Sequence, residues 1–342
     1  MPEPINIAVV GSGYWGPNLI RNIALLPDAR LHTVCDINPK ALEQNARRYP
    51  GIRTTQDFDS VLKDPDVAGV VLATPASLHA EMALAALDVG KHVMVEKPLA
   101  MSSEEALRLI QKAESNGCIL MAGHVFEFNP AVIALRDMVQ SGRLGRILYL
   151  YSQRLNLGII RDDLNVMWNL APHDFSILNF VLQQGPTAIS ARGFHLLGRK
   201  LEDVAFITVE YPGNIVANVH VSWLDPNKTR RMTVVGDEKM AVYDDVSQDE
   251  RIRLYDKGVI RDSLPDAYGE FRLVTRFGDV HIPNLPTTEP LRAECAHFVE
   301  CIRTGQQPVS SGVDGYRIVR MLEAAQQSIE QQGLPVPLNL ER

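Results

Sequence analysis

The chain has 342 residues, 46% of them hydrophobic and 22% charged, a composition that is typical of a globular protein and a length that favours two domains. Its formal net charge is -7 and it has no uncharged apolar run of about 18 residues, which argues against nucleic-acid binding and against a membrane span. The chain start lacks a basic segment before residues 5–10, so we expect a cytoplasmic protein without a secretion signal. The four cysteines lack C-x-x-C spacing, and we expect buried thiols that bind no metal.

Buried strands and helices alternate in the first part of the chain. Short apolar runs are separated by amphipathic stretches, and this alternation is typical of βαβ units that build a parallel sheet. We therefore predict an α/β fold class with a doubly wound domain over residues 1–125. The predicted strands are 5–10, 31–35, 67–73, 92–95 and 119–122, and the predicted helices are 15–26, 78–89 and 102–115, with a further helix that begins at Pro39.

After residue 125 the pattern changes to alternating apolar and polar residues. This period of two predicts a largely antiparallel, open sheet with one covered face. We assign residues 126–342 to a C-terminal α+β domain whose final helices could pack back on the first domain, and we leave 257–290 unassigned. The predicted strands are 147–155, 188–194, 205–211, 215–223, 232–235 and 240–244, and the predicted helices are 130–139, 173–182, 291–303 and 313–331.

A glycine motif of the form G-x-G-x-x-G lies between the first predicted strand and the first predicted helix. It comprises Gly11, Gly13, Tyr14, Trp15 and Gly16. In this setting the glycines allow a tight turn, a close approach to a pyrophosphate and close packing of the helix on the strand, so the motif predicts a Rossmann dinucleotide site. Asp36 follows 20 positions after Gly16, where an acidic residue can bind the ribose hydroxyls. A carboxylate there would repel a 2′-phosphate, which favours NAD over NADP.

Further candidate cofactor residues follow the third and fourth predicted strands. Thr74 and Pro75 end one strand, and His79 either faces the cofactor or lies on a helix surface. The triplet Glu96-Lys97-Pro98 ends the next strand, where an ammonium group can stabilise charge on a substrate oxygen. A cis bond before Pro98 is a further expectation. An ordinary surface turn is the alternative for the lysine.

A second group of polar residues lies in the C-terminal part. Pro172 can begin a helix, which would place His173 and Asp174 in the first turn, and a histidine suits proton transfer at neutral pH. The alternative is a helix-start charge beside a structural histidine. Upstream, Arg154, Asn156 and Arg161 could bind an anionic substrate or could be solvated at a sheet edge.

Together these residues resemble the glucose-fructose oxidoreductase / inositol dehydrogenase family (Gfo/Idh/MocA) over essentially the whole chain. Glu96-Lys97-Pro98 is the most specific feature, and the closing segment 311–316 supports it. The resemblance implies hydride transfer between nicotinamide C4 and a ring alcohol or aldehyde carbon. Lys97 would polarise the substrate oxygen and His173 would be the general acid and base. It also implies a homodimer or homotetramer, joined through the exposed face of the C-terminal sheet.

One departure and one narrower similarity refine this expectation. Many members carry Asp-x-x-x-His where this chain has Asn169 and His173, so a charged partner is missing and Lys97 and His173 remain as the catalytic pair. Segments 154–158, 165–168 and 170–174, and Gly123-His124 with Asn129-Pro130, are similar to the nucleotide-sugar branch, such as UDP-N-acetylglucosaminuronic acid 3-dehydrogenases. The substrate would be a UDP-linked hexuronate oxidised at its 3-hydroxyl. A free polyol or sugar substrate, and a catalytically silent NAD-binding sensor or partner subunit, are the alternatives. The expected substrate-binding residues are Lys97, Arg154, Asn156, Arg161, Asn169, His173 and Asp174.

Overall fold

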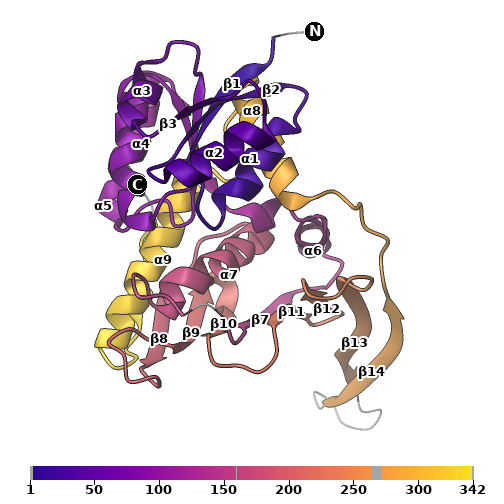
Figure 1. Ribbon diagram of the computed structural model, residues 1–342. Coiled ribbons are helices and arrows are strands. Elements are labelled where there is room, and N and C mark those ends of the chain that lie inside the picture. Colours follow the sequence, from indigo (N-terminus) through magenta and orange to yellow (C-terminus); the bar gives the residue numbers. More distant parts are fainter. Residues whose placement is uncertain (1–2, 159, 264–270, 341–342) are drawn as a thin grey trace. The chain divides into compact units, whose positions relative to one another are not determined.

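The computed structural model describes residues 3–158, 160–263 and 271–340, with the backbone alone for 260–263 and 271–272 (Figure 1). The chain folds into two compact units. The first unit contains residues 1–129 and 288–320, and the second contains 130–287 and 321–342. The first unit therefore takes a segment from near the C-terminus in addition to the N-terminal region.

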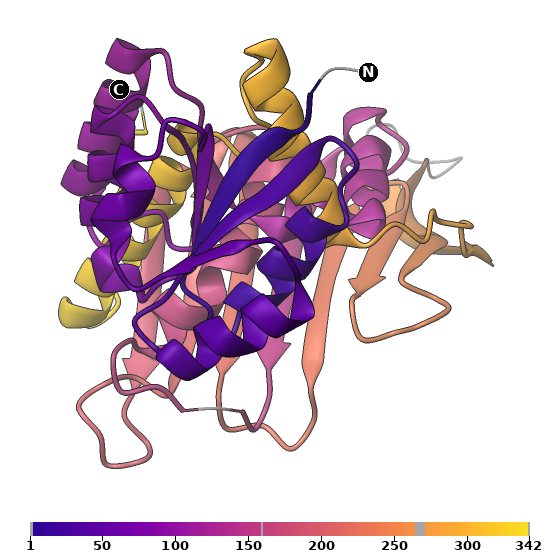
Figure 2. The same cartoon turned by 45° about the horizontal axis from the view of Figure 1, so that its top comes forward.

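The first unit is built on a parallel sheet with the order β3-β2-β1-β4-β5-β6 among its described residues (Figure 2). The order reverses between β1 and β4, which is the point where open α/β sheets bind ligands at the carboxyl ends of their strands. The strands are β1 (Ile5–Val10), β2 (Ala29–Cys35), β3 (Arg53–Thr55), β4 (Gly69–Leu72), β5 (His92–Glu96) and β6 (Leu120–Gly123). The helices are α1 (Gly16–Ala24), α2 (Pro39–Arg48), α3 (Phe58–Lys63), α4 (His79–Asp88), α5 (Ser103–Asn116), α8 (Pro290–Thr304) and the start of α9 (Gly312–Glu330).

Local signals explain several of these helix ends. Pro39 occupies the first turn of α2, and the Asn38 side chain accepts a hydrogen bond from the backbone N–H of Lys40 in the same turn at 3.1 Å. Ser102 and Glu105 form a capping box at the start of α5. The Ser102 hydroxyl accepts a hydrogen bond from the backbone N–H of Glu105, and the Glu105 carboxylate accepts one from the backbone N–H of Ser102. Two short elements, β3 and α3, were not predicted, because six or fewer residues are too few to show a period.

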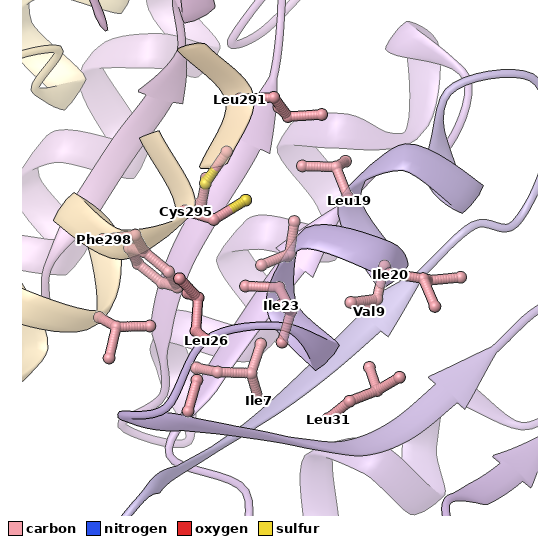
Figure 3. Close-up of a cluster of buried hydrophobic side chains, with 14 of the residues drawn as sticks. Ile7, Val9, Leu19, Ile20, Ile23, Leu26, Leu31, Leu291, Cys295 and Phe298 are labelled. Atoms are coloured by element: carbon pink, nitrogen blue, oxygen red, sulfur yellow. The ribbon is translucent and has the colours of Figure 1, made fainter. Parts of the chain in front are cut away.

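The core of the first unit joins its N-terminal and C-terminal segments. Leu19, Ile20 and Ile23 of α1 lie between the strand β1 and the helix α8 (Figure 3). The α8 side chains in this cluster are Leu291, Cys295, Phe298, Val299 and Cys301, which recur at helical spacing. Burial of this stripe is what holds α8 on the Rossmann sheet.

The second unit is built on a mixed sheet whose described strands have the order β14-β13-β12-β11-β7-β10-β9-β8-β15. All pairs are antiparallel except β7 with β10. Helix α7 (Val166–Leu182) packs on β7, β9 and β10, and α6 (Pro130–Gln140) packs on α7 (Figure 1). The strands are β7 (Ile147–Leu155), β8 (Ala188–Phe194), β9 (Val204–Tyr211), β10 (Ile215–Ser222), β11 (Thr229–Gly236), β12 (Met240–Asp244), β13 (Ile252–Ser263), β14 (Phe271–His281) and β15 (Val336–Pro337). The predicted fold class is therefore confirmed.

Two features of the second unit correct the sequence-based expectations. Helix α7 begins at Val166 and not near His173, because the Asn165 side chain caps it by accepting the Trp168 N–H at 2.9 Å, and Pro172 lies inside the helix. The buried side chains of α7 keep the helix continuous across the missing proline N–H. The segment left unassigned, 257–290, contains most of the hairpin formed by β13 and β14.

None of the helices in the described part of the chain combines the length and apolar character that crossing a bilayer requires. The four cysteines are free thiols, and Cys35, Cys295 and Cys301 are buried.

Candidate active site

The glycine loop has the local geometry of a dinucleotide site. Gly11 has φ +92°, and a Cβ atom there would lie 2.6 Å from the Ala73 carbonyl oxygen. A Cβ atom on Gly16 would collide with the Gly11 carbonyl oxygen, so α1 can approach β1 only with glycine at this position. Gly13 has no protein atom within 4 Å of its Cβ position, so its surroundings leave room for a bound phosphate. The turn at Gly11 and the close packing at Gly16 thus agree with the motif, and the contact of Gly13 with a pyrophosphate stays a prediction.

Helix α1 begins directly after this loop; Pro17 in its first turn has no N–H group, and the Asn18 N–H donates to the Trp15 carbonyl oxygen at 2.9 Å. Trp15 is the N-cap residue and makes no side-chain capping bond, and the first turn of α1 contains no acidic residue. Such a helix start favours an anion, because it carries the positive end of the helix dipole and no acidic side chain of the first turn opposes it. The Ser12 hydroxyl accepts a hydrogen bond from the buried Asn45 amide at 2.7 Å, which anchors the loop to α2. The residues therefore fit a pyrophosphate.

Asp36 is positioned directly beside the loop. Its two carboxylate oxygens accept hydrogen bonds from the backbone N–H groups of Ser12 at 2.5 Å and Asn38 at 2.7 Å. The neighbouring Ile37 and Lys40 are exposed, and no arginine lies in the immediate sequence after Asp36 to neutralise an added phosphate. This arrangement fits a ribose with free hydroxyls, and NAD is the cofactor of the fold.

Replacing Asp36 by asparagine is expected to weaken NAD binding about tenfold, or roughly 1.4 kcal/mol, while NADP binding stays the same or improves. The amide keeps one oxygen for the Ser12 N–H but removes the charge that repels a 2′-phosphate. Titration calorimetry with both cofactors measures the ratio, and Asp59→Asn, an exposed helix residue of the same unit, is the control. An unchanged NAD-to-NADP ratio would show that Asp36 makes no ribose contact.

Thr74 and His79 follow β4 at the same edge of the sheet. The Thr74 hydroxyl is buried and has no hydrogen-bond partner among the described residues, whereas Pro75 is exposed. The buried His79 ring lies between two carbonyl oxygens, with Nε2 at 2.9 Å from Thr74 and Nδ1 at 2.8 Å from Pro98. His79 thus links the β4 loop to the turn after Lys97. Its predicted contact with the cofactor stays a prediction.

Glu96 and Lys97 stand at the end of β5, next to β4 in the parallel sheet. Burial raises the pKa of Glu96 to about 7, although the charge of Lys97 lowers it. The Glu96 carboxylate accepts hydrogen bonds from the Trp15 side chain and from the Lys97 backbone N–H, the latter at 3.3 Å. The Lys97-Pro98 peptide bond is cis, as expected from the sequence. The structure therefore brings the glycine loop, Asp36, Thr74 and Lys97 to one edge of one sheet.

The charge of Lys97 also acts on two buried histidines. Burial lowers the pKa of His124 to about 4, and the charge of Lys97 acts in the same direction. Burial lowers the pKa of His79 as well, again with a contribution from Lys97. Gly123 pairs with Glu96 in the register of β5 and β6, so His124 follows at the position next to Lys97. The two buried histidines nearest to Lys97 are thus held in their uncharged forms, and Glu96 is the acidic group beside its amine.

In the second unit, two predicted substrate residues bind each other. Arg154 Nε lies 2.7 Å from Asp174 Oδ2, and the two side chains are 6% and 3% exposed. The Ser152 hydroxyl donates to the other oxygen of Asp174 at 2.5 Å. The pair therefore ties α7 to β7. Because Asp174 already binds the guanidinium group, the contact of either residue with substrate stays a prediction.

His173 and Asn169 lie one turn apart on α7, each half-buried. Asn156 follows β7 and donates its backbone N–H to the Ser222 carbonyl oxygen at 3.2 Å. Arg161 is paired with Asp163 at 2.7 Å on the exposed loop before α7. The two arginines that suggested an anionic substrate are thus both engaged by aspartates. Lys97 and His173 belong to different units, and their joint action is a proposal made below.

Three buried titratable residues of the first unit were not among the candidate site residues; sequence reasoning favoured a structural role for His124 and missed Glu127 and Glu294. His124 is 1% exposed, Glu127 is 5% exposed and Glu294 is fully buried. Glu294 occupies a position on the apolar stripe of α8, between Leu291 and Cys295, and this was the one available signal. Glu127 follows β6 without a recognisable pattern, so no motif could reveal it.

Within the described ranges, His32, Asp64 and Asp66 form the one group that places three possible metal ligands within 4.8 Å of each other. Arg53 Nη1 lies 2.6 Å from Asp64 Oδ2, and Lys91 donates to the Asp64 carbonyl oxygen at 2.8 Å. Two cations therefore already lie at this aspartate. The expectation of no metal role stays a prediction.

Known proteins match the chain along most of its length. The model of the GFO/IDH/MocA oxidoreductase family with NAD-binding Rossmann fold matches residues 5–124, and the GFO/IDH/MocA C-terminal domain model matches residues 132–242. The chain is 27% identical to scyllo-inositol 2-dehydrogenase (NAD(+)) of Bacillus subtilis, and the match covers 100% of this chain and 98% of the relative.

Solved structures agree with these matches. A protein structure from Magnetospirillum magnetotacticum MS-1 is 30% identical with a TM-score of 0.80, covering 94% of this chain and 100% of that one. UDP-N-acetylglucosamine 3-dehydrogenase from Acidithiobacillus ferrooxidans is 25% identical with a TM-score of 0.82, covering 97% and 99%. With both family models matched in chain order and the dinucleotide site in place, the chain belongs to the GFO/IDH/MocA family and is an NAD-dependent oxidoreductase.

Proposed function

We propose that the enzyme oxidises a ring hydroxyl of a sugar or polyol and that Lys97 and His173 are its catalytic residues. The observation that carries the proposal is the position of Lys97, at the carboxyl end of β5 on the edge that holds the glycine loop and Asp36. Bound NAD supplies a hydride acceptor at this edge. A cation beside the acceptor favours an alcohol oxygen that becomes more negative as the hydride leaves.

Oxidation of a CH–OH group releases one hydride and one proton, so the site also needs a proton acceptor. His173 is the candidate, since an imidazole titrates close to neutral pH and this side chain is half-buried on α7. Lys97 would donate a hydrogen bond to the substrate oxygen and His173 would take its proton. Asn169, one turn earlier on α7, is uncharged and can orient a hydroxyl or the imidazole by hydrogen bonding.

For the substrate class, we propose a nucleotide-linked sugar oxidised at its 3-hydroxyl, with a UDP-linked hexuronate as the first candidate. The support is the full-length similarity to a UDP-N-acetylglucosamine 3-dehydrogenase. The similarity to a scyllo-inositol dehydrogenase supports a free polyol as the second candidate. Arg154 and Arg161 add less to the first candidate than the sequence suggested, because Asp174 and Asp163 already bind them.

Incubation of the protein with NAD and single substrates tests the proposal, with NADH absorbance as the readout. The panel contains UDP-N-acetylglucosamine, its uronic acid, scyllo-inositol and myo-inositol. Because a retained NADH would hide turnover, the cofactor is also released by denaturation and identified after incubation with each substrate. NAD binding without reduction by any sugar or polyol would favour the catalytically silent sensor.

We further propose that the enzyme is a homo-oligomer joined through the sheet face opposite α7. Tyr149, Tyr151 and Phe206 are 43%, 36% and 44% exposed, and Phe206 stacks on His220 at 4.2 Å between ring centroids. Aromatic residues on an exposed sheet face are typical of protein interfaces. Sedimentation is expected to give a multiple of the 38.0 kDa chain mass.

Variants separate this sheet face from other exposed apolar positions. Tyr149→Glu with Phe206→Glu is expected to shift the protein toward monomer, whereas Leu25→Glu, at an exposed residue of the first unit, is expected to leave the mass unchanged. A wild-type monomer at micromolar concentration would contradict the proposal.

A further inference from the structure

Three glutamates are buried in the first unit close to the end of β5. Glu96 ends β5, Glu127 lies in the 3-10 turn after β6, and Glu294 lies on α8, with 9%, 5% and 0% of their surfaces exposed. A carboxylate that leaves water without a cation or hydrogen-bond donors is strongly disfavoured. The three groups therefore cannot all be ionised in the folded protein.

The hydrogen bonds distinguish Glu96 from Glu294. Glu96 accepts bonds from the Trp15 side chain and the Lys97 backbone, and it has the charge of Lys97 beside it. Both carboxyl oxygens of Glu294 are buried and find no hydrogen-bond partner in the described part of the chain. Glu96 is thus built to carry a negative charge, whereas Glu294 is stable only as a neutral acid.

The electrostatic effects agree with this division. Burial raises the pKa of Glu294 well above its usual value, and the charges of Glu96 and Glu127 raise it further. Burial also raises the pKa of Glu127, with a contribution from Asp314 at the start of α9. The Lys97 charge lowers the pKa of Glu96 alone among the three. Glu96 therefore loses its proton first.

A metal ion is a poorer occupant of this region than a proton. In the residues that the structure describes, the three glutamates and His124 do not bring three ligand atoms within 4.8 Å of one another, as His32, Asp64 and Asp66 do. His124 is uncharged at neutral pH because burial and Lys97 depress its pKa to about 4. The charged and titratable groups that surround the glutamates are Lys97 from β5, His124 after β6, Cys295 from α8 and Asp314 from α9.

We propose that Glu294 is a positioning residue that keeps a proton at neutral pH, so that the negative charge of Glu96 faces the amine of Lys97 without a second charge from α8. The proton-holding part rests on the first unit alone, and the effect on Lys97 rests on the proposed function. Helix α8, which packs on α1 through Leu291, Cys295 and Phe298 (Figure 3), would bring this neutral acid to the cofactor domain from the far end of the chain.

The first test is the pH dependence of Tm in Glu294→Gln, which keeps the shape but cannot ionise. A group whose pKa is raised by folding stabilises the protein below its unfolded pKa, and that stabilisation is lost as pH rises through the folded pKa. Glu294→Gln lacks this loss, so the difference between its Tm and that of wild type should increase from pH 5 to pH 9. At pH 9 the Tm of the variant should be roughly 3 °C above that of wild type. Glu300→Gln, an exposed residue of α8, should follow wild type throughout. A Tm difference between Glu294→Gln and wild type that does not change with pH would overturn the proposal.

A second measurement detects the proton directly and begins with the wild-type enzyme. In protein labelled with ¹³C at the glutamate carboxyl carbons, a resonance of a protonated carboxyl group should persist at pH 7.5, and its absence would overturn the proposal. Because burial also raises the pKa of Glu127, the resonance of Glu294 is the one that disappears in Glu294→Gln, and a spectrum that this substitution leaves unchanged would contradict the proposal.

The third test uses kcat to distinguish the charged role of Glu96 from the neutral role of Glu294. Glu96→Gln removes the negative charge that faces Lys97, so its kcat is expected to be at least tenfold below that of Glu294→Gln, with the NAD Kd of both variants within threefold of wild type. Equal losses of kcat would mean that Glu294 is needed as an anion, which contradicts the proposal. If wild type oxidises no substrate at all, the function proposal fails, and the Tm and resonance measurements still decide whether Glu294 holds a proton.

Discussion

Replacing Lys97 by methionine is expected to lower kcat at least 10²-fold while the Kd for NAD changes less than threefold. Methionine has a similar length but no charge, so the change removes the cation and keeps the packing. A positive group in a water-poor site stabilises charge on the reacting oxygen far more than it would in water, and no other lysine directly follows a strand at this edge in the described sheet.

The same substitution has an electrostatic consequence that can be measured without substrate. The charge of Lys97 lowers the pKa of Glu96, which burial raises to about 7. Removing the cation should therefore move the Glu96 pKa above about 7, and the variant should take up a proton there at neutral pH. Lys112→Met, a surface lysine paired with Asp88, is the matched control and should leave kcat unchanged. Equal losses of NAD affinity and turnover would instead make Lys97 a cofactor-holding residue.

Breaking the buried pair of Arg154 and Asp174 is expected to have the largest effect on stability. Arg154→Met leaves the Asp174 carboxylate buried with a hydrogen bond from the Ser152 hydroxyl but without its cation, and such changes cost about 3–5 kcal/mol. The expected fall in Tm is roughly 10 °C. The combined variant Arg154→Met/Asp174→Leu removes both charges and should recover most of the loss, because no unpaired charge remains.

Arg161→Met is the control for this prediction. Its partner Asp163 and Arg161 itself are 51% and 41% exposed, and exposed pairs contribute about 1 kcal/mol or less. Thermal unfolding followed by circular dichroism measures all variants. Similar Tm values for Arg154→Met and Arg161→Met would show that the buried pair contributes no more than a surface pair.

Much of the cofactor domain could be predicted because its signals are local. The β1 strand, the glycine loop, the start of α2 at Pro39 and the capping box at Ser102 each depend on a few neighbouring residues. Apolar runs and glycines have the same consequences wherever the chain is placed, so the strand that ends at Val10 and the carboxylate at Asp36 were found from spacing alone.

Predictions from local sequence failed in two places, at the start of α7, where packing overrode the preference of proline for a helix start, and in the hairpin of β13 and β14, where the alternation of apolar residues was weak. Pro172 suggested a helix start, but Asn165 caps α7 seven residues earlier and the buried face carries the helix through the proline. The hairpin of β13 and β14 was missed because its strands pair mainly with each other and show no clear buried face in the sequence.

The sequence by itself determined the fold class and the cofactor, because glycine conformation, apolar periodicity and side-chain chemistry are properties of short segments, and the family resemblance selected Lys97 and His173 as candidate residues. Only the tertiary structure decided the partners of the buried charged residues. Arg154 of β7 pairs with Asp174 of α7, and Glu294 of α8 lies close to Glu96 and Glu127, which are far from it in the sequence. Charges interact through space and respond to burial, so neither pairing nor protonation can be derived from distance along the chain.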